Sequence, residues 1–587
     1  MENSELSLGG NIWKSAIVDD SLVERMALSY NLPPYLARLL CERGIGFNDV
    51  NNFITPKVQN LMPEPYVLKD MQKAVERVAE AVINGEKIAI IGDYDVDGAT
   101  STSELTRFFR TVGINPQIHI PSREEGYGPS DLAFSEFKAA ETKLVITIDC
   151  GTTAFDVLNR AAENGFEIIV IDHHEAEAVL PKVYAVINPK RLDEDNQYPY
   201  LAYMSAVGVG FMFLVALNRK LRQSGFYETH KAPDLLSLLD LVALGTVCDV
   251  VPLLGVNRAY VRQGLKVMAQ QRNLGLKSLL KAAAVESAPS SYHLGFVLGP
   301  RINACGRVGD ATLGSRLLCT ENETEAQMLA DKFNALNSER KDIENYVLLQ
   351  AIEQVEGQTQ EYPIAFAYGE DWHQGVIGIV AGKLKERYNV PSFVMSVEPD
   401  EVKGSARSID GVDLGALIIS AKEKGILTAG GGHIMAAGFS LQKEQIPAFK
   451  KFVGEYVEER LGKEKIAPEL NIDISLALSG VTEKFADDLA LLEPYGAGNP
   501  EPLVMIKNVC INRPRLVGSG HVSCFLGSPY GGSLKAIAFR CADTEIGNAM
   551  LHDNGELFDV VGQIKTDVWQ GRKTIQMIIN DIKRTGK

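Results

Sequence analysis

Short apolar runs alternate with amphipathic stretches between about residues 66 and 175. Ile88–Ile91, Lys143–Asp149 and Glu167–Asp172 are rich in Ile, Leu and Val, which is typical of buried strands. Leu68–Asn84 and Ala99–Gly113 lie before and after the first of these runs and are predicted to be helices. Strands that alternate with helices indicate a mostly parallel sheet covered by helices on both faces.

Each of the three predicted strands is followed by side chains that bind metals in proteins. Asp93, Asp95 and Asp97 follow the first strand, Asp149 ends the second, and Asp172–His174 follow the third. One acidic strand end can equally be a solvated turn. The carboxyl ends of parallel strands, however, face a common crevice in open sheets. Three such ends therefore predict a metal site.

A fourth carboxylate follows an apolar helix. Residues Asp234–Val247 are predicted to form this helix, which leads to Asp249 in the segment CDVVP. An unpaired carboxylate beside apolar residues is costly, so Asp249 needs a partner. The alternative is a helix-terminal aspartate that accepts hydrogen bonds from backbone N–H groups. Because the other acidic residues are predicted to meet nearby, we assign Asp249 to the same site.

The residue types in this site indicate which metal it would hold. Several aspartates with one or two histidines and no cysteine favour Mn²⁺ or Mg²⁺ over structural zinc. The carboxylates outnumber those that one ion requires, so a two-metal site is expected. Two ions about 3.5–4 Å apart can hold an attacking hydroxide and neutralise a phosphoryl transition state. The expected reaction class is therefore phosphoester hydrolysis.

The remaining stretches predict further units. Residues 1–65 suggest short helices, and residues 310–357 suggest charged helices that connect two lobes. Residues 362–455 resume the alternation of strands and helices. From Asn471 onward, short β-like runs separated by Gly, Pro and Asn predict a small barrel. These runs are Leu503–Ile506, Ser533–Phe539, Glu556–Ile564 and Lys573–Ile579.

Composition and charge limit the classes of function. A chain of 587 residues is expected to form two to four domains. No apolar run is long enough to span a bilayer, and the N-terminus lacks a basic region followed by an apolar one, so a cytoplasmic location is expected. The eight cysteines include no CxxC pair, which argues against a disulfide framework or a cysteine-held zinc.

The net charge of −16 argues against nucleic-acid binding, because phosphate contacts need Lys and Arg. The charge is unevenly distributed, however. From Asn471 to the end there are 12 Lys and Arg against 13 Asp and Glu, a net charge of −1, so −15 lies before that point. An acidic protein can still carry a basic groove, and nucleic-acid binding stays open.

The motifs together resemble the DHH phosphoesterase superfamily. The segment DYDVDG that begins at Asp93, Asp149 in ITIDCGTT, the triplet Asp172–His174 and Asp249 in GTVCDVVPL match its four signature motifs in order. Three further segments resemble its RecJ exonuclease branch, so the resemblance runs from about residue 65 to about residue 580. These segments are GPRINACGR at 299–307, KGSARS around Arg407 and GGGHIMAAG around His433.

This resemblance implies roles for the residues of the predicted metal site. Asp149 is expected to bridge two ions and to act in catalysis, and His174 to donate a proton or hydrogen bond to the reacting phosphate. The alternative role for His174 is to orient His173. Asp93 is either a direct ligand or a group that orients the others. The implied metal ligands are Asp93, Asp95, Asp97, Asp149, His173 and Asp249.

The resemblance also implies residues that bind the substrate. Arg123 lies in a glycine-rich loop, and the alternative for it is a surface arginine paired with Glu124 or Glu125. Ser405 and Arg407 would form an anion pocket for a 5′-phosphate, although the glycines before His433 can also be a plain turn. The implied substrate-binding residues are Arg123, Arg301, Asn303, Arg307, Ser405, Arg407, Gly432 and His433.

The predicted barrel has candidates for binding single strands, because barrels of this family stack bases on aromatic side chains beside a basic groove. Each aromatic residue could equally belong to the barrel core. The candidates are the aromatic residues Phe525, Tyr530 and Trp569 and the basic residues Arg513, Arg515, Lys535 and Arg572.

The sequence therefore predicts an α/β protein. A parallel-sheet DHH lobe and a smaller α/β DHH-associated lobe are joined by a long helix and followed by a C-terminal all-β oligonucleotide-binding (OB) barrel. The expected segments are an N-terminal helical extension at 1–65, a DHH catalytic domain at 66–310, the connecting helix at 311–360, the DHH-associated domain at 361–465 and the OB domain at 466–587.

The expected function is that of a metal-dependent 5′→3′ exonuclease on single-stranded DNA that releases 5′-mononucleotides in recombination and repair. The expected partners are single-stranded DNA, a repair helicase and a single-strand-binding protein, with no membrane. Two alternatives remain. One is a DHH phosphodiesterase on nanoRNA, cyclic dinucleotides or pyrophosphate, whose relatives generally lack the barrel. The other is an inactive replication scaffold, which would have lost metal ligands.

Overall fold

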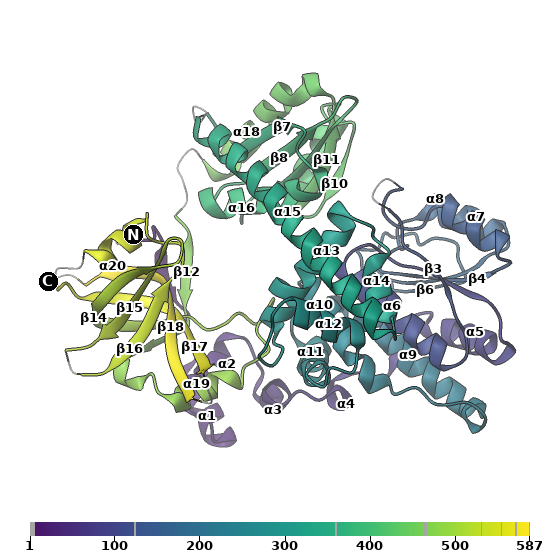
Figure 1. Cartoon of the computed structure of the whole chain (residues 1–587), viewed down its shortest axis with the longest axis horizontal. Helices are drawn as coiled ribbons and strands as arrows, with labels where there is room; N and C mark the ends of the chain where they lie inside the picture. Colours follow the sequence, from purple (N-terminus) through teal and green to yellow (C-terminus); the bar gives the residue numbers. More distant parts are fainter. Residues whose placement is uncertain are drawn as a thin grey trace. The chain divides into compact units, whose positions relative to one another are not determined.

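The computed structural model (Figure 1) describes residues 6–122, 125–195, 197–357, 361–462, 467–529, 531–552, 555–569 and 572–585, without the side chains of 567–569 and 572. The chain divides into two compact units. Unit 1 comprises Met1–Gly306, Asp310–Asp331 and Glu469–Lys587, and unit 2 comprises Arg307–Gly309 and Lys332–Pro468.

Unit 1 contains a five-stranded parallel sheet, as the sequence predicts. The strand order is β3-β2-β4-β5-β6, and every neighbouring pair is parallel. Alternate side chains of its strands belong to two separate hydrophobic cores, so both faces are covered. The strands are β2 (Ile88–Ile91), β3 (Gln117–His119), β4 (Leu144–Ile148), β5 (Glu167–Ile171) and β6 (Ala185–Ile187).

Helices cover the two faces of this sheet unequally. One face packs against α5 (Met71–Asn84), α6 (Val96–Thr111) and α9 (Ala206–Gln223). The other face packs against α7 (Asp131–Ala139) and α8 (Phe155–Glu163). The larger helical layer brings α6 and α9 together at the carboxyl end of β2, where the acidic residues lie.

A group of helices follows α9. The apolar helix α10 (Leu239–Cys248) is almost completely buried and packs on α6, α9 and α11, as expected for a helix that is apolar on all sides. The 35-residue α15 (Glu323–Gly357) lies within the stretch 311–360 predicted as the connecting helix, the first part of which instead forms a separate helix, α14 (Leu313–Cys319). The others are α11 (Gly255–Met268), α12 (Leu274–Ala282), the π-helix η6 (His293–Leu298) and α13 (Gly299–Val308).

Unit 2 is a smaller α/β fold with strand order β10-β11-β9-β8-β7. The predicted alternation holds only for its first part, because β7 and β8 are parallel whereas β8, β9, β11 and β10 are antiparallel. Helices α17 and α18 cover one face, and α15 and α16 the other. The elements are β7 (Ala365–Glu370), α16 (Gln374–Tyr388), β8 (Ser392–Val397), β9 (Val402–Arg407), α17 (Leu414–Glu423), β10 (Ala429–Gly432), β11 (Ala436–Leu441) and α18 (Ile446–Leu461).

The C-terminal part of unit 1 is a closed β-barrel, as predicted. Its strand order is β13-β14-β15-β16-β18-β17, and pairing of β14 with β17 closes it. No strand is predicted from the sequence at β15, because His521 and Ser523 alternate with Val522 and Cys524 and leave no continuous apolar run. The strands are β13 (Ile474–Leu476), β14 (Val504–Val517), β15 (His521–Gly527), β16 (Ser533–Ala538), β17 (Phe558–Trp569) and β18 (Arg572–Arg584).

The N-terminal segment differs from the prediction of helices alone. It begins with β1 (Ile12–Ser15), which pairs in parallel with β12 (Glu469–Ile472). A strand of four residues whose partner lies more than 450 positions away leaves no local signal. Helices α1 (Asp20–Tyr30) and α2 (Pro34–Glu42) then pack on the barrel, and their buried side chains share its hydrophobic core. The two ends of the chain are thus stabilised together.

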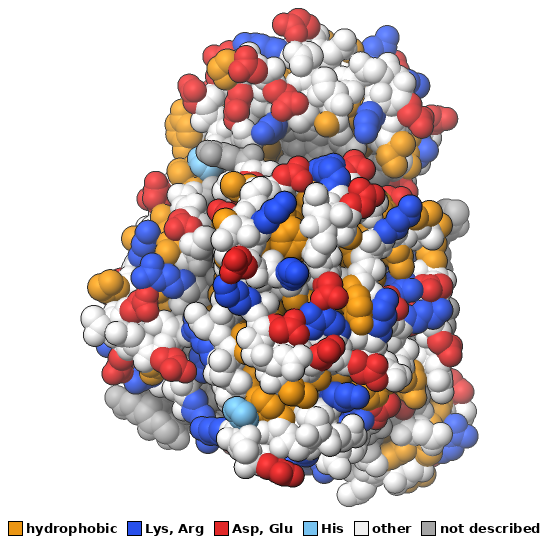
Figure 2. All heavy atoms as spheres, turned by 90° about the vertical axis from the view of Figure 1, so that its right-hand side faces the viewer, with side chains coloured by type: hydrophobic (Ala, Val, Ile, Leu, Met, Phe, Trp, Pro, Cys, Tyr) orange, Lys and Arg blue, Asp and Glu red, His pale blue; other side chains and the backbone are white. Residues whose placement is uncertain are grey.

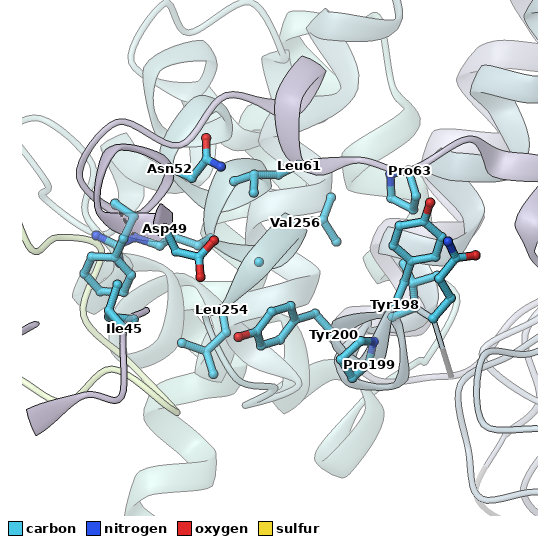
Figure 3. A pocket seen from close by; sticks show the side chains of 15 residues that line it. Ile45, Asp49, Asn52, Leu61, Pro63, Tyr198, Pro199, Tyr200, Leu254 and Val256 are labelled. Carbon is cyan, nitrogen blue, oxygen red and sulfur yellow. Dashed lines mark hydrogen bonds between the residues drawn. The ribbon is translucent and has the colours of Figure 1, made fainter. Parts of the chain in front are cut away.

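Arg258 links three segments of unit 1. Its side chain is buried, and it donates hydrogen bonds to the carbonyl oxygens of Phe53, Leu492 and Glu493, each at 2.8 Å. Beside it lies a cavity of about 290 Å³. Asp49 and Tyr200, which lie far apart in the sequence, both border this cavity (Figure 3). None of the predicted metal ligands lines it.

In the described part of the chain, no helix combines the length and the apolar character needed to cross a bilayer.

Candidate metal centre

The first acidic loop connects β2 to α6. The N-cap of α6 is Asp95, whose Oδ1 accepts a hydrogen bond from the Gly98 N–H at 3.0 Å. Gly98 is required by space, since a Cβ atom there would lie 2.5 Å from the carbonyl oxygen of Asp93. The close approach of this first helical turn to the strand end keeps the three carboxylates together.

Asp97 is fixed by the start of another helix. Its Oδ2 accepts from the Ala206 N–H at 2.6 Å and its Oδ1 from the Val207 N–H at 3.1 Å, both at the N-terminus of α9. A helix N-terminus carries free N–H groups and partial positive charge, so it stabilises this buried carboxylate. On the opposite side, a Cβ at Gly245 of α10 would lie 2.7 Å from Asp97 Oδ1.

Two residues of the site have left-handed backbone conformations. Asp149, which follows β4, has φ +63°, and Val250, which follows Asp249, has φ +58°. This conformation is unfavourable for a β-branched residue, and such strain concentrates at functional sites. The Tyr127 hydroxyl donates to the Asp149 carbonyl oxygen at 2.9 Å. Both turns therefore direct a carboxylate into the same region.

His173 lies at the centre of the cluster. Its Nε2 is 3.2 Å from Asp149 Oδ1 and 3.8 Å from Asp97 Oδ2, and its Nδ1 is 3.6 Å from Asp249 Oδ2. Three sets of ligand atoms lie within 4.8 Å of one another. These sets are Asp93, Asp95 and Asp149; Asp97, His173 and Asp249; and Asp149, His173 and His174.

Asp172 organises the site rather than facing the other carboxylates. Its Oδ1 accepts from the N–H groups of His173 (2.8 Å) and His174 (3.3 Å) and lies 2.7 Å from His174 Nδ1. Its Oδ2 accepts from the Thr152 N–H at 2.9 Å. Burial raises the pKa of Asp172, but these hydrogen bonds and the His174 charge outweigh burial and lower it. Burial lowers the pKa of His174, yet the hydrogen bond that its ring donates to the Asp172 carboxylate raises the pKa to about 8.

Three other aspartates of the site have raised pKa values, because burial and neighbouring carboxylates act on each of them. Burial and the charge of Asp249 raise the pKa of Asp97, and burial and the charge of Asp95 raise that of Asp249. Burial and the neighbouring aspartates, Asp97 first, raise the pKa of Asp149. Among the described residues, His173 Nδ1 and Asp249 Oδ2 are buried without a hydrogen-bond partner. A divalent cation bound by oxygen and imidazole ligands would satisfy these atoms.

One face of the molecule can be compared with this buried cluster. On the face of the molecule drawn in Figure 2, acidic and basic side chains are interspersed. No continuous basic stripe is visible there, in agreement with the net charge of −16. Surface charge on this face therefore marks no binding site, whereas the buried groups mark the metal site.

The predicted arginine segment forms α13 and packs beside the first acidic loop, since a Cβ at Gly306 would lie 2.7 Å from the Tyr94 carbonyl oxygen. Arg301 donates to the Val297 carbonyl oxygen at 2.7 Å, and burial lowers its pKa. Arg307 donates to the Gly375 carbonyl oxygen at 2.8 Å. Asn303 is half-buried in the same helix. Arg123 lies outside the described residues.

The substrate candidates of unit 2 lie at one end of its sheet. Arg407 donates from Nη1 to Ser405 Oγ at 3.1 Å, and burial lowers its pKa. Ala406, between them, is a cross-strand neighbour of Ala437, which in turn pairs with Gly432. His433 follows in an exposed turn. Gly432, predicted to lie in a turn, is instead the last residue of β10, because its segment pairs with β11.

The barrel candidates are only partly described. Phe525 on β15 and Lys535 on β16 are exposed and lie directly opposite each other. Arg513 and Arg515 are exposed on β14, the other neighbour of β15. Tyr530 and the side chains of Trp569 and Arg572 lie outside the described residues.

Three supporting residues are absent from the sequence-based prediction. Tyr127 contacts the Asp149 carbonyl oxygen and lies 3.3 Å from His174. Thr152 donates its N–H to Asp172, and Asn188 donates from Nδ2 to Thr152 Oγ1 and to the His174 carbonyl oxygen, both at 2.9 Å. The glycine-rich loop around Tyr127 is a signal for a ligand-binding loop. Nothing local identifies Asn188, which follows β6.

Family models match the chain in three places. The DHH family N-terminal domain matches residues 87–246, the DHHA1 domain residues 361–459, and the RecJ OB domain residues 472–581. The single-stranded-DNA-specific exonuclease RecJ of Escherichia coli is 35% identical over 95% of this chain and 97% of its own length. The corresponding protein of Bacillus subtilis is 32% identical over 97% of this chain and 70% of its own length.

The chain belongs to the RecJ family. A crystal structure of RecJ from Thermus thermophilus in complex with Mn²⁺ has a TM-score of 0.81 and 28% identity, and covers 100% of this chain and 81% of its own. A second structure from that organism contains Mg²⁺ and has a TM-score of 0.76, with 26% identity over 98% of this chain and 79% of its own. These findings confirm the predicted family and fold class. The domain boundaries and the roles of individual residues stay predictions.

Proposed function

We propose that this RecJ-family protein is a metal-dependent exonuclease specific for single-stranded DNA. One observation carries the proposal: a cluster of five aspartates and two histidines, four of these seven side chains buried, lies in the same chain as a closed OB barrel. The curated relatives that are 32–35% identical are named single-stranded-DNA-specific exonucleases. Single-stranded DNA is accordingly the proposed substrate.

Mn²⁺ or Mg²⁺ is the proposed cofactor, because the donor atoms are carboxylate oxygens and imidazole nitrogens and the related structures contain these ions. Two bound ions would activate the water nucleophile and neutralise charge on the phosphate. We assign the position shared by two ions to Asp149: it belongs to two of the three ligand sets, as His173 does, and a carboxylate has two oxygen atoms that could each bind one ion. The proposed ligands are Asp93, Asp95, Asp97, Asp149, His173 and Asp249.

His174 is the proposed hydrogen-bond and proton donor to the reacting phosphate. Its ring is half-exposed, so a substrate oxygen can approach it, while Asp172 holds its Nδ1 at 2.7 Å. With a pKa of about 8, the ring keeps its proton at neutral pH. Asp172 thereby positions the donor, and Tyr127 and Asn188 fix the surrounding backbone.

The polarity of cleavage would come from unit 2. Ser405 and Arg407 offer a hydroxyl and a guanidinium group, and Gly432 offers exposed backbone. We assign these groups, with His433, to the 5′-phosphate of the strand, so that hydrolysis proceeds 5′→3′ and releases 5′-mononucleotides. Arg123, Arg301, Asn303 and Arg307 are proposed to contact the following phosphates, and the barrel to hold the strand further along.

An exonuclease of this polarity needs single-stranded DNA, which recombination and repair produce. We therefore propose a repair helicase and a single-strand-binding protein as partners, and a cytoplasmic location where bacterial relatives would meet DNA. The two alternatives are less favoured. The barrel matches the RecJ OB domain, which argues against an enzyme for dinucleotides or pyrophosphate, and every proposed metal ligand is present, which argues against an inactive scaffold.

The test compares oligonucleotides that carry a label at the 5′ or the 3′ end. With Mn²⁺, the proposal predicts early release of the 5′ label as a mononucleotide from single strands, late release of the 3′ label and little release from blunt duplexes. Rapid cleavage of dinucleotides with negligible release from long single strands would instead identify a small-substrate phosphodiesterase.

A further inference from the structure

Two large aromatic side chains of unit 1 are exposed together. Tyr292 is 61% exposed and Phe296 is 74% exposed. Their ring centroids are 5.3 Å apart and the ring planes are inclined by 26°, so the rings are stacked on each other. Exposed stacked aromatic rings form a flat apolar surface in contact with water, and this exposure is unfavourable unless a ligand covers it.

The backbone beneath this aromatic pair is unusual. Phe296 lies in the π-helix η6 (His293–Leu298), and Tyr292 is the residue before it. A π-helical turn is rare and is frequently found at functional sites. Here the same segment buries Leu294 and Leu298 while it presents Tyr292 and Phe296 to solvent. One side of this segment is therefore packed in the protein interior, and the other side faces solvent.

The buried side of η6 contacts the C-terminal end of α10, next to the metal centre. The Leu294 carbonyl oxygen lies 3.4 Å from Cys248 Sγ, and a Cβ at Gly299 would lie 2.6 Å from the same sulfur. The next residue along the chain is the proposed ligand Asp249. It is followed by Val250, which is 71% exposed.

The start of the same segment contacts the chain that enters the barrel. Ser291 Oγ donates to the Tyr495 carbonyl oxygen at 2.6 Å. The Leu253 N–H donates to the Ala497 carbonyl oxygen at 2.8 Å, so the chain after Asp249 also reaches this linker. The aromatic pair thus lies between the Asp249 end of α10 and the linker to the barrel, all within unit 1.

We infer that Tyr292 and Phe296 form a stacking platform for a base of the single strand as it leaves the metal centre toward the barrel. This inference rests on the proposed function and adds a base-binding site to it. Every base has a π-face, so stacking on aromatic rings holds a single strand without sequence preference. A base inside a duplex is already stacked on both faces and gains nothing here. The platform therefore favours single strands and positions the scissile phosphate.

Nucleic acid is favoured over a protein occupant by the position of the platform. It adjoins a site with the donor set for a phosphodiesterase metal centre and the linker to an OB barrel. Both ends of the platform therefore meet surfaces proposed to bind the same strand. A protein segment would have to compete with that strand for this position.

The test replaces both rings by leucine. Tyr292→Leu/Phe296→Leu keeps apolar side chains but removes the flat rings, whereas Phe296→Trp keeps a ring. Leu236→Ala is the matched control, since Leu236 is 56% exposed near the other end of α10. KM and kcat are measured with Mn²⁺ on a single-stranded oligonucleotide and on copies that carry one abasic nucleotide at successive positions from the 5′ end.

We expect the double leucine variant to raise KM about tenfold with kcat changed less than twofold, because stacking on aromatics contributes on this scale per base. In the wild type and in Phe296→Trp, one or two abasic positions should raise KM by a similar factor. In the double variant this penalty should fall below twofold, and Leu236→Ala should behave as wild type. A merely structural role would not remove a position-specific abasic penalty.

Two failures are distinguishable. If the wild type cleaves single strands and the double variant has the same KM and the same abasic penalty, the platform is wrong and the proposed function stands; a protein partner would then be the better occupant. If the wild type neither cleaves nor binds single-stranded oligonucleotides, the proposed function is wrong and the platform falls with it.

Discussion

The Nε2 atom of His173 lies 3.2 Å from Oδ1 of Asp149, although the two residues follow different strands of the sheet. Because β4 and β5 are parallel neighbours, their carboxyl ends place both side chains at one edge. His173 also lies within 3.8 Å of Asp97 and Asp249. This convergence of three other chain segments on the His173 imidazole is the structural basis of the proposed metal centre.

Asp149→Asn should abolish hydrolysis while leaving DNA binding intact. The substitution keeps the shape of the side chain but removes the charge that two ions would share, so we expect kcat to fall at least a hundredfold. Cleavage of a labelled single strand and fluorescence anisotropy of the same strand measure the two properties. Asp156→Asn, on the exposed face of α8, is the control. Rapid cleavage by this variant would contradict the proposal that Asp149 is shared between two metal ions.

Gly98→Ala should weaken metal binding without unfolding the sheet. The new Cβ would lie 2.5 Å from the Asp93 carbonyl oxygen, so the acidic loop must move away from the first turn of α6. We expect Mn²⁺ affinity to fall at least tenfold by isothermal titration calorimetry. Gly382→Ala is the control, because a Cβ at that position meets nothing within 4 Å. Unchanged affinity in Gly98→Ala would show that the loop tolerates this shift.

Asp172→Asn should impair activity because it disturbs the positions of His173 and His174, not because it removes a metal ligand. One oxygen of Asp172 accepts from the Thr152 N–H and the other from the backbone and ring of the histidine pair. An amide can serve only one of these sides, because its NH₂ group would face a donor on the other. We expect a loss of stability of about 1–3 kcal/mol in denaturant unfolding and a fall in kcat of more than tenfold. Wild-type stability and activity would contradict the organising role of Asp172.

Glu42 should make the protein less stable as the pH rises. Its side chain is buried on α2, and burial together with the charge of Asp473 raises its pKa to about 7, although Arg38 opposes this. The folded state therefore binds the Glu42 proton more tightly than the unfolded state does. Its stabilising contribution is complete below the ordinary glutamate pKa and is lost as the pH rises toward 7.

Glu42→Gln removes this titration. We expect the variant to unfold at a higher temperature than the wild type at pH 8, and the difference to shrink or reverse at pH 4.5, in thermal unfolding followed by circular dichroism. Glu24→Gln, at an exposed position of α1, should show no such pH dependence. An equal difference at both pH values would show that Glu42 is ionised in the folded protein throughout.

The sequence predicts the parallel sheet and its site because their signals are local. Ile88–Ile91 is predicted as a strand and is one, and Asp93, Asp149 and Asp172 each follow a strand end. The sequence does not reveal what Asp172 does in the site. Only the structure shows that its carboxylate is turned toward Thr152 and His174. Its place in a motif cannot distinguish a ligand from an organising residue.

Long-range pairing accounts for the other differences. The strand β1 depends on β12 at the far end of the chain, and β10 depends on β11, so neither has a periodic pattern strong enough to identify it alone. The exposed pair Tyr292 and Phe296 is similarly hidden, because its significance comes from the contacts of Leu294 with Cys248 and of Ser291 with Tyr495.

The proposed metal centre is tested most directly by release of a 5′ label from single-stranded DNA as metal is removed and returned. Chelator-treated wild-type protein should release no label, and added Mn²⁺ should restore release of the labelled 5′-mononucleotide, whereas Asp149→Asn should stay inactive at every Mn²⁺ concentration. Label release that persists in excess chelator, or that Asp149→Asn performs at the wild-type rate, would contradict the proposed metal centre.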